Sequence, residues 1–252
     1  QAPHIMIMAE PNSKVHLMEG CTSPVLAKHS LHLDMTEAFI KDNAEVKLTV
    51  LQNWPQYVHT RPKTRAKVGK KASFKNTTVG LGPGKSNISN PKYWVDEEGT
   101  VEMNTIILGK EDSYVSVGGE INLEGKGSSG INESKAVIMD EASVVSEGVI
   151  NALEEGTEGH IGCDALTTSP NASMETYPGL ASEESNTDLS HEAGIGNIRE
   201  KELFYLQSRG LTEEEATQLI VKGFVSPLIE DIPLEFKSEI KKIIEMSVNG
   251  SL

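Results

Sequence analysis

The stretch 43-NAEVKLTVLQNW-54 alternates strictly between apolar and polar side chains over most of its length. Its apolar set is Ala44, Val46, Leu48 and Val50, and the polar set between them is Glu45, Lys47 and Thr49. Successive side chains of an extended chain point to opposite faces, so this pattern predicts a β-strand with one buried face.

Similar stretches fill most of the first two hundred residues, and each is closed by Gly, Asn, Asp or Ser. They are KASFKNTTVGLG (71–82), GTVEMNTIILG (99–109), EDSYVSVGGEINLEG (111–125) and SKAVIMDEASVVSEGVINALEEG (134–156). Only HSLHLDMTEAFI (29–40) could be either helix or strand. Many short strands are typical of a sandwich, a barrel or a β-solenoid. Small and acidic residues at the turns of 134–159 favour the solenoid, whose stacked coils need small corners.

Residues 198–252 have a different character and predict three short helices. Thr212 is a natural N-cap with Glu215 three residues later, which predicts a capping box, and Gly223 is expected to end that helix. A further helix is expected to begin near Asp231 and Pro233. Its apolar stripe is Phe236, Ile240, Ile243 and Ile244. About fifty residues cannot hold a core alone, so these helices must pack on the β body or on a partner.

Composition excludes several classes of function. The formal net charge of −14 over 252 residues argues against nucleic acid and against an anionic membrane surface as the main partner. A basic strip between Val46 and Val95 contains no Asp or Glu, and its simplest interpretation is one solvated face of the protein. Two cysteines are too few for a disulfide framework, and neither a run of ~18 apolar residues nor a signal-peptide pattern is present. These features predict a cytoplasmic protein.

Common enzyme signatures are missing. GLGPGKS (80–86) lacks the spacing of a phosphate-binding loop, and Pro83 removes a backbone donor, so a turn is expected there. Neither a serine nucleophile elbow nor a paired Cys-x-x-Cys zinc site occurs.

What remains is a set of soft and borderline metal ligands. Cys163 and Asp164 cannot face the same site in a strand, and neither can His191 and Glu192. Spacing alone favours a buried Cys163 that acts as a small hydrophobe, and a His191 at the surface near the first helix. A second cluster contains Cys21, Gln52 and Trp54, for which packing is again the simplest interpretation.

The stretch LSHEAGIGNIREKELFYLQSRGLTEEEATQLIVKGFVSPLIEDIPLEF (189–236) closely resembles the C-terminal signature of the SufB/SufD family, the scaffold proteins of SUF iron–sulfur cluster assembly. EGCTSP (19–24), DNAEVKLTVLQNW (42–54) and CDALTTSPNA (163–172) resemble its central regions, so the resemblance covers nearly the whole chain. It implies a right-handed parallel β-helix over 1–197 and a small α-helical segment over 198–252. It further implies a SufC-type ABC ATPase docked on the C-terminal helices, and a dimer joined through the β-helix edge strands.

The same resemblance implies roles for individual residues. Cys163 matches the scaffold cysteine of the family, and Glu192 and His191 match the carboxylate and imidazole beside it. Cys21, Gln52 and Trp54 match positions that resemble an inner sulfur-transfer route. One thiolate per subunit, completed by a carboxylate or an imidazole, would hold a transient iron–sulfur cluster weakly enough to release it to acceptor apoproteins. Because both Cys163 and Glu192 are present, the resemblance is to SufB and implies a homodimer.

Two other functions stay open at this point. A β-helix carbohydrate-active enzyme would use paired carboxylates, but the acids here are scattered at turns and few aromatic residues could stack on sugars. A SufD-like partner would have a purely structural role. The favoured interpretation is a non-enzymatic scaffold, with ATP hydrolysis on SufC.

Overall fold

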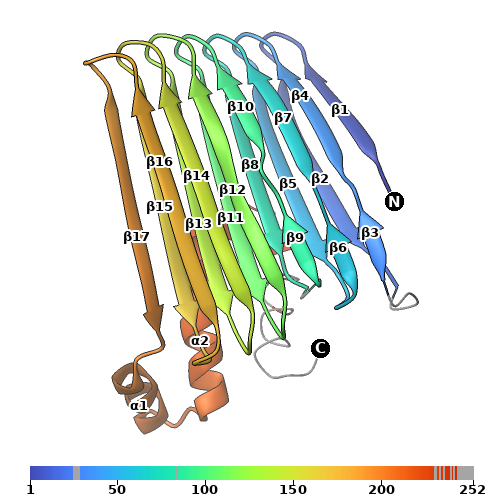
Figure 1. Cartoon of the computed structure of the whole chain (residues 1–252), viewed down its shortest axis with the longest axis vertical. Helices are drawn as coiled ribbons and strands as arrows, with labels where there is room; N and C mark the ends of the chain where they lie inside the picture. Colours follow the sequence, from blue (N-terminus) through green and yellow to red (C-terminus); the bar gives the residue numbers. More distant parts are fainter. Residues whose placement is uncertain are drawn as a thin grey trace.

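The computed structural model describes residues 1–24, 29–82 and 84–229, together with 232, 234, 236–238, 240 and 242. In these parts of the chain, strands stack into a β-solenoid of about seven turns, with short helices at its C-terminal side (Figure 1). The predicted parallel β-helix is therefore confirmed, and the ambiguous stretch 29–40 forms strands rather than a helix.

Two sheets form the walls of the solenoid, and every strand pairing within the described residues is parallel. The first sheet contains β1 (His4–Ala9), β3 (Ser30–His32), β4 (Met35–Ile40), β6 (Val58–Thr60), β7 (Lys63–Val68), β9 (Ser86–Ile88), β10 (Lys92–Val95), β12 (Tyr114–Leu123), β14 (Ser143–Ala152) and β16 (Ser173–Ser182). The second contains β2 (Lys14–Thr22), β5 (Glu45–Asn53), β8 (Ser73–Gly80), β11 (Thr100–Gly109), β13 (Ser129–Ile138), β15 (Glu158–Thr167) and β17 (Asp188–Asn197).

Each coil of the solenoid brings like positions into register along the second sheet. Thr100 pairs with Ser129, and Ser129 pairs with Glu158, so these partners lie 29 residues apart along the chain. A residue in the left-handed backbone region turns successive coils, with φ between 52° and 69°. These turn residues are Asn12, Asn43, Lys71, Glu98, Gly127 and Gly156. Glycine and asparagine tolerate this conformation best, which explains part of the turn composition seen in the sequence.

The core fills the space between the two walls. Within β5, Val46, Leu48 and Val50 are buried, as the alternation of 43–54 predicts, and they join a continuous apolar cluster that runs along the solenoid. Aliphatic side chains dominate it, with Phe74 and Tyr93 as its largest members. Interior rows of like residues are thus stacked coil upon coil.

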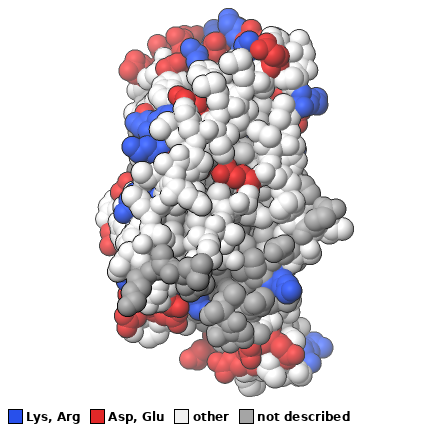
Figure 2. Space-filling model, turned by 90° about the vertical axis from the view of Figure 1, so that its right-hand side faces the viewer, with Lys and Arg blue, Asp and Glu red and all other residues white. Residues whose placement is uncertain are grey.

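The outer surface pairs the lysines of one coil with the acids of the next. Lys70 lies 2.8 Å from Glu97, and Lys75 lies 2.7 Å from Glu102. Further pairs of this kind are Lys71–Glu98, Lys85–Asp112 and Lys92–Glu120. The basic strip between Val46 and Val95 is therefore largely compensated by the acidic coils that follow it. The end of the solenoid that carries β1 and β2 presents a largely uncharged face, with one acidic group near its middle and the other charges toward its edges (Figure 2).

Helix α2 (Glu213–Val225) packs on the outside of the second sheet. It starts with the predicted capping box, in which the Glu215 amide donates to the Thr212 hydroxyl at 3.2 Å. The prediction that Gly223 ends this helix is wrong. Val221 and Val225 are buried against the outer face of the sheet, and their packing carries the helix past the glycine. A short 3₁₀ helix, η1 (Ser226–Ile229), follows.

Helix α1 (Glu200–Ser208) differs from α2 because it buries none of its residues. Strand β17 ends at Asn197, so the change of architecture falls where the sequence predicts it, although a division into two domains at 197/198 stays a prediction. Of the further helix expected near the C-terminus, Asp231, Pro233, Ile243 and Ile244 lie outside the described residues, as does Pro83 of the predicted turn. No helix in the described part of the chain is long and apolar enough to cross a membrane.

Candidate functional site

Cys163 lies on the interior face of β15, with only 3% of its surface exposed. Its sulfur is 3.4 Å from the hydroxyl of Ser146, which reaches across from β14 in the opposite sheet. Ser146 in turn is 3.2 Å from the hydroxyl of Ser134, the register neighbour of Cys163 on β13. The thiol therefore sits in the apolar core with one hydroxyl contact, as the packing interpretation predicts.

Asp164 points to the opposite side of the sheet from Cys163. Its carboxylate accepts a hydrogen bond from the Lys135 ammonium at 3.0 Å on the outer surface. The predicted alternation of these two neighbours is confirmed, and Asp164 cannot share a site with the Cys163 thiol of the same chain.

His191 and Glu192 lie on β17, the strand stacked on β15. His191 pairs with Ile161, whose side chain is interior, and Glu192 pairs with Gly162. Because register neighbours in a parallel ladder share a face, His191 lies on the same face as Cys163, one strand further along. Glu192 lies on the outer face. The register therefore shows that His191 faces inward and Glu192 outward, which spacing alone left open.

On the outer face, Glu192 joins a cluster that sequence reasoning missed. The His160 Nε2 atom lies 3.9 Å from a Glu192 carboxylate oxygen and 3.6 Å from one of Glu133. The His160 Nδ1 atom is 2.9 Å from the Ser190 hydroxyl. Burial raises the pKa of Glu133, and the imidazole beside it opposes that rise.

Gly162 lies between Glu133 and Glu192 in the ladder, and a Cβ atom there would come within 2.3 Å of the Glu133 carboxylate. The glycine therefore leaves room for this carboxylate to lie across the sheet.

At the other end of the solenoid, Cys21 occupies the interior face of β2. It pairs in register with Gln52 of β5, and its thiol donates a hydrogen bond to Glu19 at 3.2 Å. Burial and the carboxylates of Glu19 and Asp34 raise the pKa of this thiol to about 12. Burial also raises the pKa values of Glu19 and Asp34 themselves.

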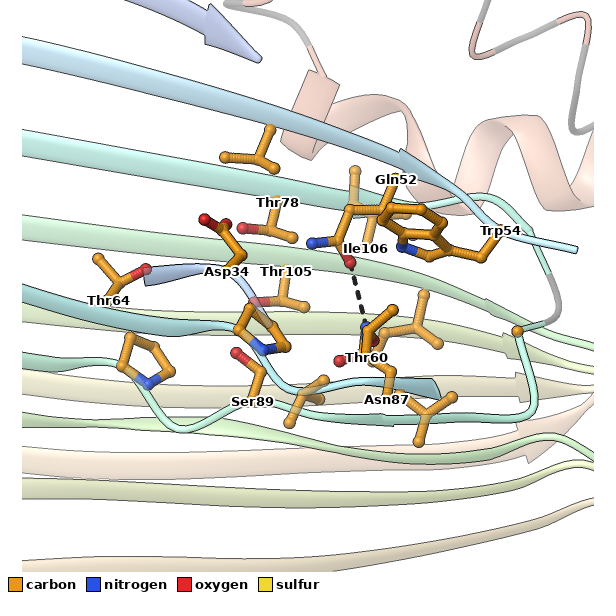
Figure 3. Close-up of a pocket in the computed structure, with 18 of the residues that line it drawn as sticks. Asp34, Gln52, Trp54, Thr60, Thr64, Thr78, Asn87, Ser89, Thr105 and Ile106 are labelled. Atoms are coloured by element: carbon orange, nitrogen blue, oxygen red, sulfur yellow. Dashed lines mark hydrogen bonds between the residues drawn. The ribbon is translucent and has the colours of Figure 1, made fainter. Parts of the chain in front are cut away.

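Gln52 and Trp54 line a polar cavity inside the solenoid (Figure 3). The Gln52 side-chain oxygen accepts a hydrogen bond from Asn87 at 3.2 Å. Trp54 packs against His32 with 4.6 Å between ring centroids, and its indole N–H finds no partner among the described residues. Gly82 crosses over Trp54 so closely that a Cβ atom there would be 2.3 Å from the Trp54 amide nitrogen.

The cavity leaves about 60 Å³ for the centres of water molecules, so it is large enough to hold water. Its lining includes side chains of β5, β8, β11 and β12, but none from β13 onward in the described part of the chain. Buried polar atoms without a partner in that part include Asp34 Oδ1, Thr60 Oγ1, Asn76 Oδ1 and Asn87 Oδ1. Such atoms need water or a polar ligand as a partner, and the cavity has room for one.

A single interior row connects the two ends of the second sheet. It runs through Glu19, Val50, Thr78, Thr105, Ser134 and Cys163. Five inter-strand steps of about 4.8 Å place the coil of Cys21 roughly 24 Å from that of Cys163. Thr78 and Thr105 line the cavity, whereas Ser134 and Ser146 fill the remaining distance to the thiol.

No three His, Cys, Asp or Glu side chains of the described residues are placed so that they could hold a metal ion. Within one chain, Cys163 and His191 share the interior face, while Glu192 does not join them. The geometry provides two thiols near opposite ends of the solenoid: Cys21 beside carboxylates, and Cys163 in the apolar core with one hydroxyl contact.

The family model for the SUF system FeS cluster assembly SufBD core domain matches residues 1–224. The chain belongs to the SufBD family. A SufBD family protein of Pyrococcus horikoshii is 66% identical to this SufBD chain over 250 residues, which are 99% of the chain and 56% of the relative. One of Methanothermobacter thermautotrophicus is 36% identical over 99% of the chain and 61% of the relative. SufB of Bacillus subtilis is 29% identical over the whole chain and 55% of its own length. The SufBD chain thus spans between half and two thirds of these relatives.

Sequence reasoning missed several side chains near the two thiols of the SufBD chain. For Glu19 a signal was available, because it stands two residues before Cys21 and alternation predicts that the two share a face. The same spacing separates His32 from Asp34. Ser146 comes from the opposite wall, and only the folded coil brings its hydroxyl to Cys163.

Proposed function

We propose that this chain is a SUF-system scaffold that assembles a labile iron–sulfur cluster between two subunits and hands it to acceptor apoproteins in the cytoplasm. The observation that carries the proposal is the position of Cys163. Its thiol lies on the interior face one strand from β17, which pairs only with β15 within the described residues. Family membership supplies the class of cargo.

A second subunit at the β17 edge would complete the ligand shell. Unpaired edge strands invite pairing with another chain, and β17 exposes most of its residues. Two chains meeting there would bring two Cys163 thiols and two His191 imidazoles toward one seam, with Glu192 at its outer rim. A shell of few thiolates and weaker donors suits a cluster that must be released.

Sulfur would enter at the opposite end and travel inside the solenoid. In this proposal Cys21 receives sulfur, and the cavity beside Gln52 and Trp54 carries it toward Cys163. The cavity supports this route because it lies between the two thiols and its mixed lining includes polar side chains such as Gln52, Thr78 and Thr105.

The C-terminal helices would dock a SufC-type ABC ATPase. ATP hydrolysis would take place on that partner and not on the scaffold. Helix α1 supports this role because Phe204 and Tyr205 are 72% and 56% exposed while no residue of the helix is buried. Large exposed aromatic side chains of this kind are typical of interface anchors.

Oxygen-free reconstitution with ferrous iron and soluble sulfide tests the cluster site. The wild-type chain should gain the visible absorption of an iron–sulfur cluster, and Cys163→Ala should lose it. Cys21→Ser is the matched control and should retain the cluster, because dissolved sulfide bypasses the proposed route. A Cys163→Ala chain with wild-type cluster yield would contradict the proposal. No chromophore in any variant, together with intact ATPase binding, would instead indicate a purely structural SufD-like role.

A further inference from the structure

Glu19 and Cys21 form a close pair on the interior face of β2. The Cys21 thiol donates to Glu19 Oε1 at 3.2 Å, so the proton of the thiol already points at a carboxylate. The other carboxylate oxygen of Glu19, Oε2, is buried and has no hydrogen-bond partner in the described part of the chain. Glu19 Oε1 therefore accepts the hydrogen bond of the thiol, and Glu19 Oε2 makes no hydrogen bond to a described residue.

Among the described residues, the groups that act on this pair are a carboxylate and an imidazole, with no lysine or arginine. Asp34 is 6% exposed and His32 is 5% exposed, and Asp34 Oδ1 and both His32 ring nitrogens have no partner among the described residues. The charged groups that act on Glu19 are Cys21 and Asp34, and Asp34 in turn faces His32. With neither lysine nor arginine among these, burial raises the pKa of the Glu19 carboxyl.

The thiol by itself is poorly suited to react. At a pKa of about 12, roughly one Cys21 side chain in 10⁵ is a thiolate at neutral pH. The thiolate is the nucleophile in sulfur chemistry, so a thiol in this environment needs a partner that removes its proton as it attacks.

We propose that Glu19 is the general base that accepts the Cys21 proton when this thiol attacks the outer sulfur of a persulfide. The inference rests on the proposed function, in which Cys21 receives sulfur. A bond forms between the Cys21 sulfur and the outer sulfur of the donor, R–S–SH, and the S–S bond of the donor breaks. The proton passes from Cys21 to Glu19 and then to the departing R–S⁻. The products are a Cys21 persulfide and R–SH, with no net oxidation or reduction.

Charge alone predicts the opposite effect of changing Glu19, which makes the role testable. The Glu19 carboxylate raises the pKa of the thiol, so a purely electrostatic neighbour would slow the reaction and its neutralisation would speed it. If Glu19 is a general base, its neutralisation should instead slow the reaction, because the proton acceptor is lost. The direction of the change therefore separates the two roles.

The test uses a Cys163→Ala chain, in which Cys21 is the one remaining thiol. This parent is mixed with glutathione persulfide, and the formation of the Cys21 persulfide is followed by intact mass against time between about pH 6 and pH 9, the range in which a positioned base acts. In the same background, Glu19→Gln should slow uptake by about 10²-fold at neutral pH, and its rate should then rise steadily with pH. The parent rate should stay level at neutral pH and fall in acid as Glu19 takes up a proton.

Asp34→Asn is the matched control. It removes a neighbouring charge that also raises the pKa of the thiol, but Asp34 does not bond to the thiol, so uptake should become faster. Glu19→Asp keeps a carboxylate and should restore the level pH profile at a reduced rate. Thermal melting of each variant checks that it is folded.

Uptake by Glu19→Gln at the parent rate or faster would overturn the role of Glu19 and leave the sulfur route intact. A parent chain that takes up no sulfur at any pH would overturn the route itself, and the base with it. The two failures are therefore distinguishable.

Discussion

Ser146→Ala should make the cluster on this scaffold about tenfold easier to remove. The substitution deletes the hydroxyl 3.4 Å from the Cys163 sulfur and leaves that sulfur with an apolar neighbour. A hydrogen bond to a charged group contributes about 1.5–3 kcal/mol, and the long distance here argues for the lower end. About 1.5 kcal/mol corresponds to roughly a tenfold change in an equilibrium or, where release is limited by this bond, in a rate.

The cost to the fold should be moderate. Ser146 is buried, but its other partner, Ser134, keeps a hydrogen bond to the Gly162 carbonyl at 3.4 Å. The two neutral hydrogen bonds that Ser146 makes, to Ser134 and to the Cys163 thiol, are worth about 1 kcal/mol each, so their loss lowers the melting temperature of a chain of this size by roughly 4–8 °C.

The assay is the transfer of a reconstituted cluster to a strong chelator without oxygen, followed by the loss of visible absorption. Ser134→Ala is the matched control, because it removes a buried hydroxyl of the same row that does not touch the thiol. Release from Ser146→Ala at the wild-type rate would refute the reasoning. Equal acceleration in both variants would refute it too, since a general loosening of the core would then explain the effect.

Three further predictions concern other parts of the molecule. The double variant Phe204→Ala, Tyr205→Ala on α1 should abolish binding of the SufC-type ATPase in a pull-down. Its melting temperature should stay within about 1 °C of the wild-type value, because both side chains are exposed. Leu219→Ala on α2, where the leucine is 51% exposed, is the control. Val225→Ala should cost about 2–3 kcal/mol in urea unfolding, because two methyl groups leave a buried contact between α2 and the sheet; an unchanged midpoint would show that α2 does not stabilise the body. Burial lowers the pKa of His32 below 6.5, so the unfolded chain binds the proton first and the His32 contribution to stability is lost as pH falls below about 6.5. Melting temperatures of wild type and His32→Gln should therefore converge or cross between about pH 6.5 and pH 5, and parallel curves would contradict this assignment.

Alternation was sufficient to predict the strands and their buried faces, because a side-chain period of two needs no knowledge of neighbouring coils. It correctly predicted that Cys163 and Asp164 face opposite sides of their strand. It could not choose between His191 and Glu192, since that choice depends on which residue of β15 each one pairs with. The coil repeat escaped detection because coils differ in length: Lys14 pairs with Glu45, 31 residues on, whereas Ser73 pairs with Thr100, 27 residues on.

Tertiary packing explains what local signals missed. Gly223 is a sound helix terminator by propensity, but Val225 gains a buried position by continuing the helix over the sheet, and burial of an aliphatic side chain outweighs a glycine penalty of about 1 kcal/mol. Ser146 reaches Cys163 from 17 residues away in sequence, across the interior, and no periodicity in one strand encodes a contact between opposite walls.

The solenoid explains why the two thiols can have different chemistry in one small molecule. Each coil contacts only its neighbours, so the environment of a residue is set by its own coil and the adjacent ones. Cys21 lies beside the carboxylates of Glu19 and Asp34, which raise the pKa of its thiol, and Glu19 is the proposed acceptor of its proton. Cys163 lies about five strand spacings away and is contacted by a neutral hydroxyl. A cysteine that receives sulfur needs a proton acceptor, whereas one that ligates iron as a thiolate needs a donor that stabilises negative charge. Exchanging the two settings, with Glu19→Ser at one end and Ser146→Glu at the other, should therefore impair sulfur uptake and cluster binding separately, each measurable by the assays above.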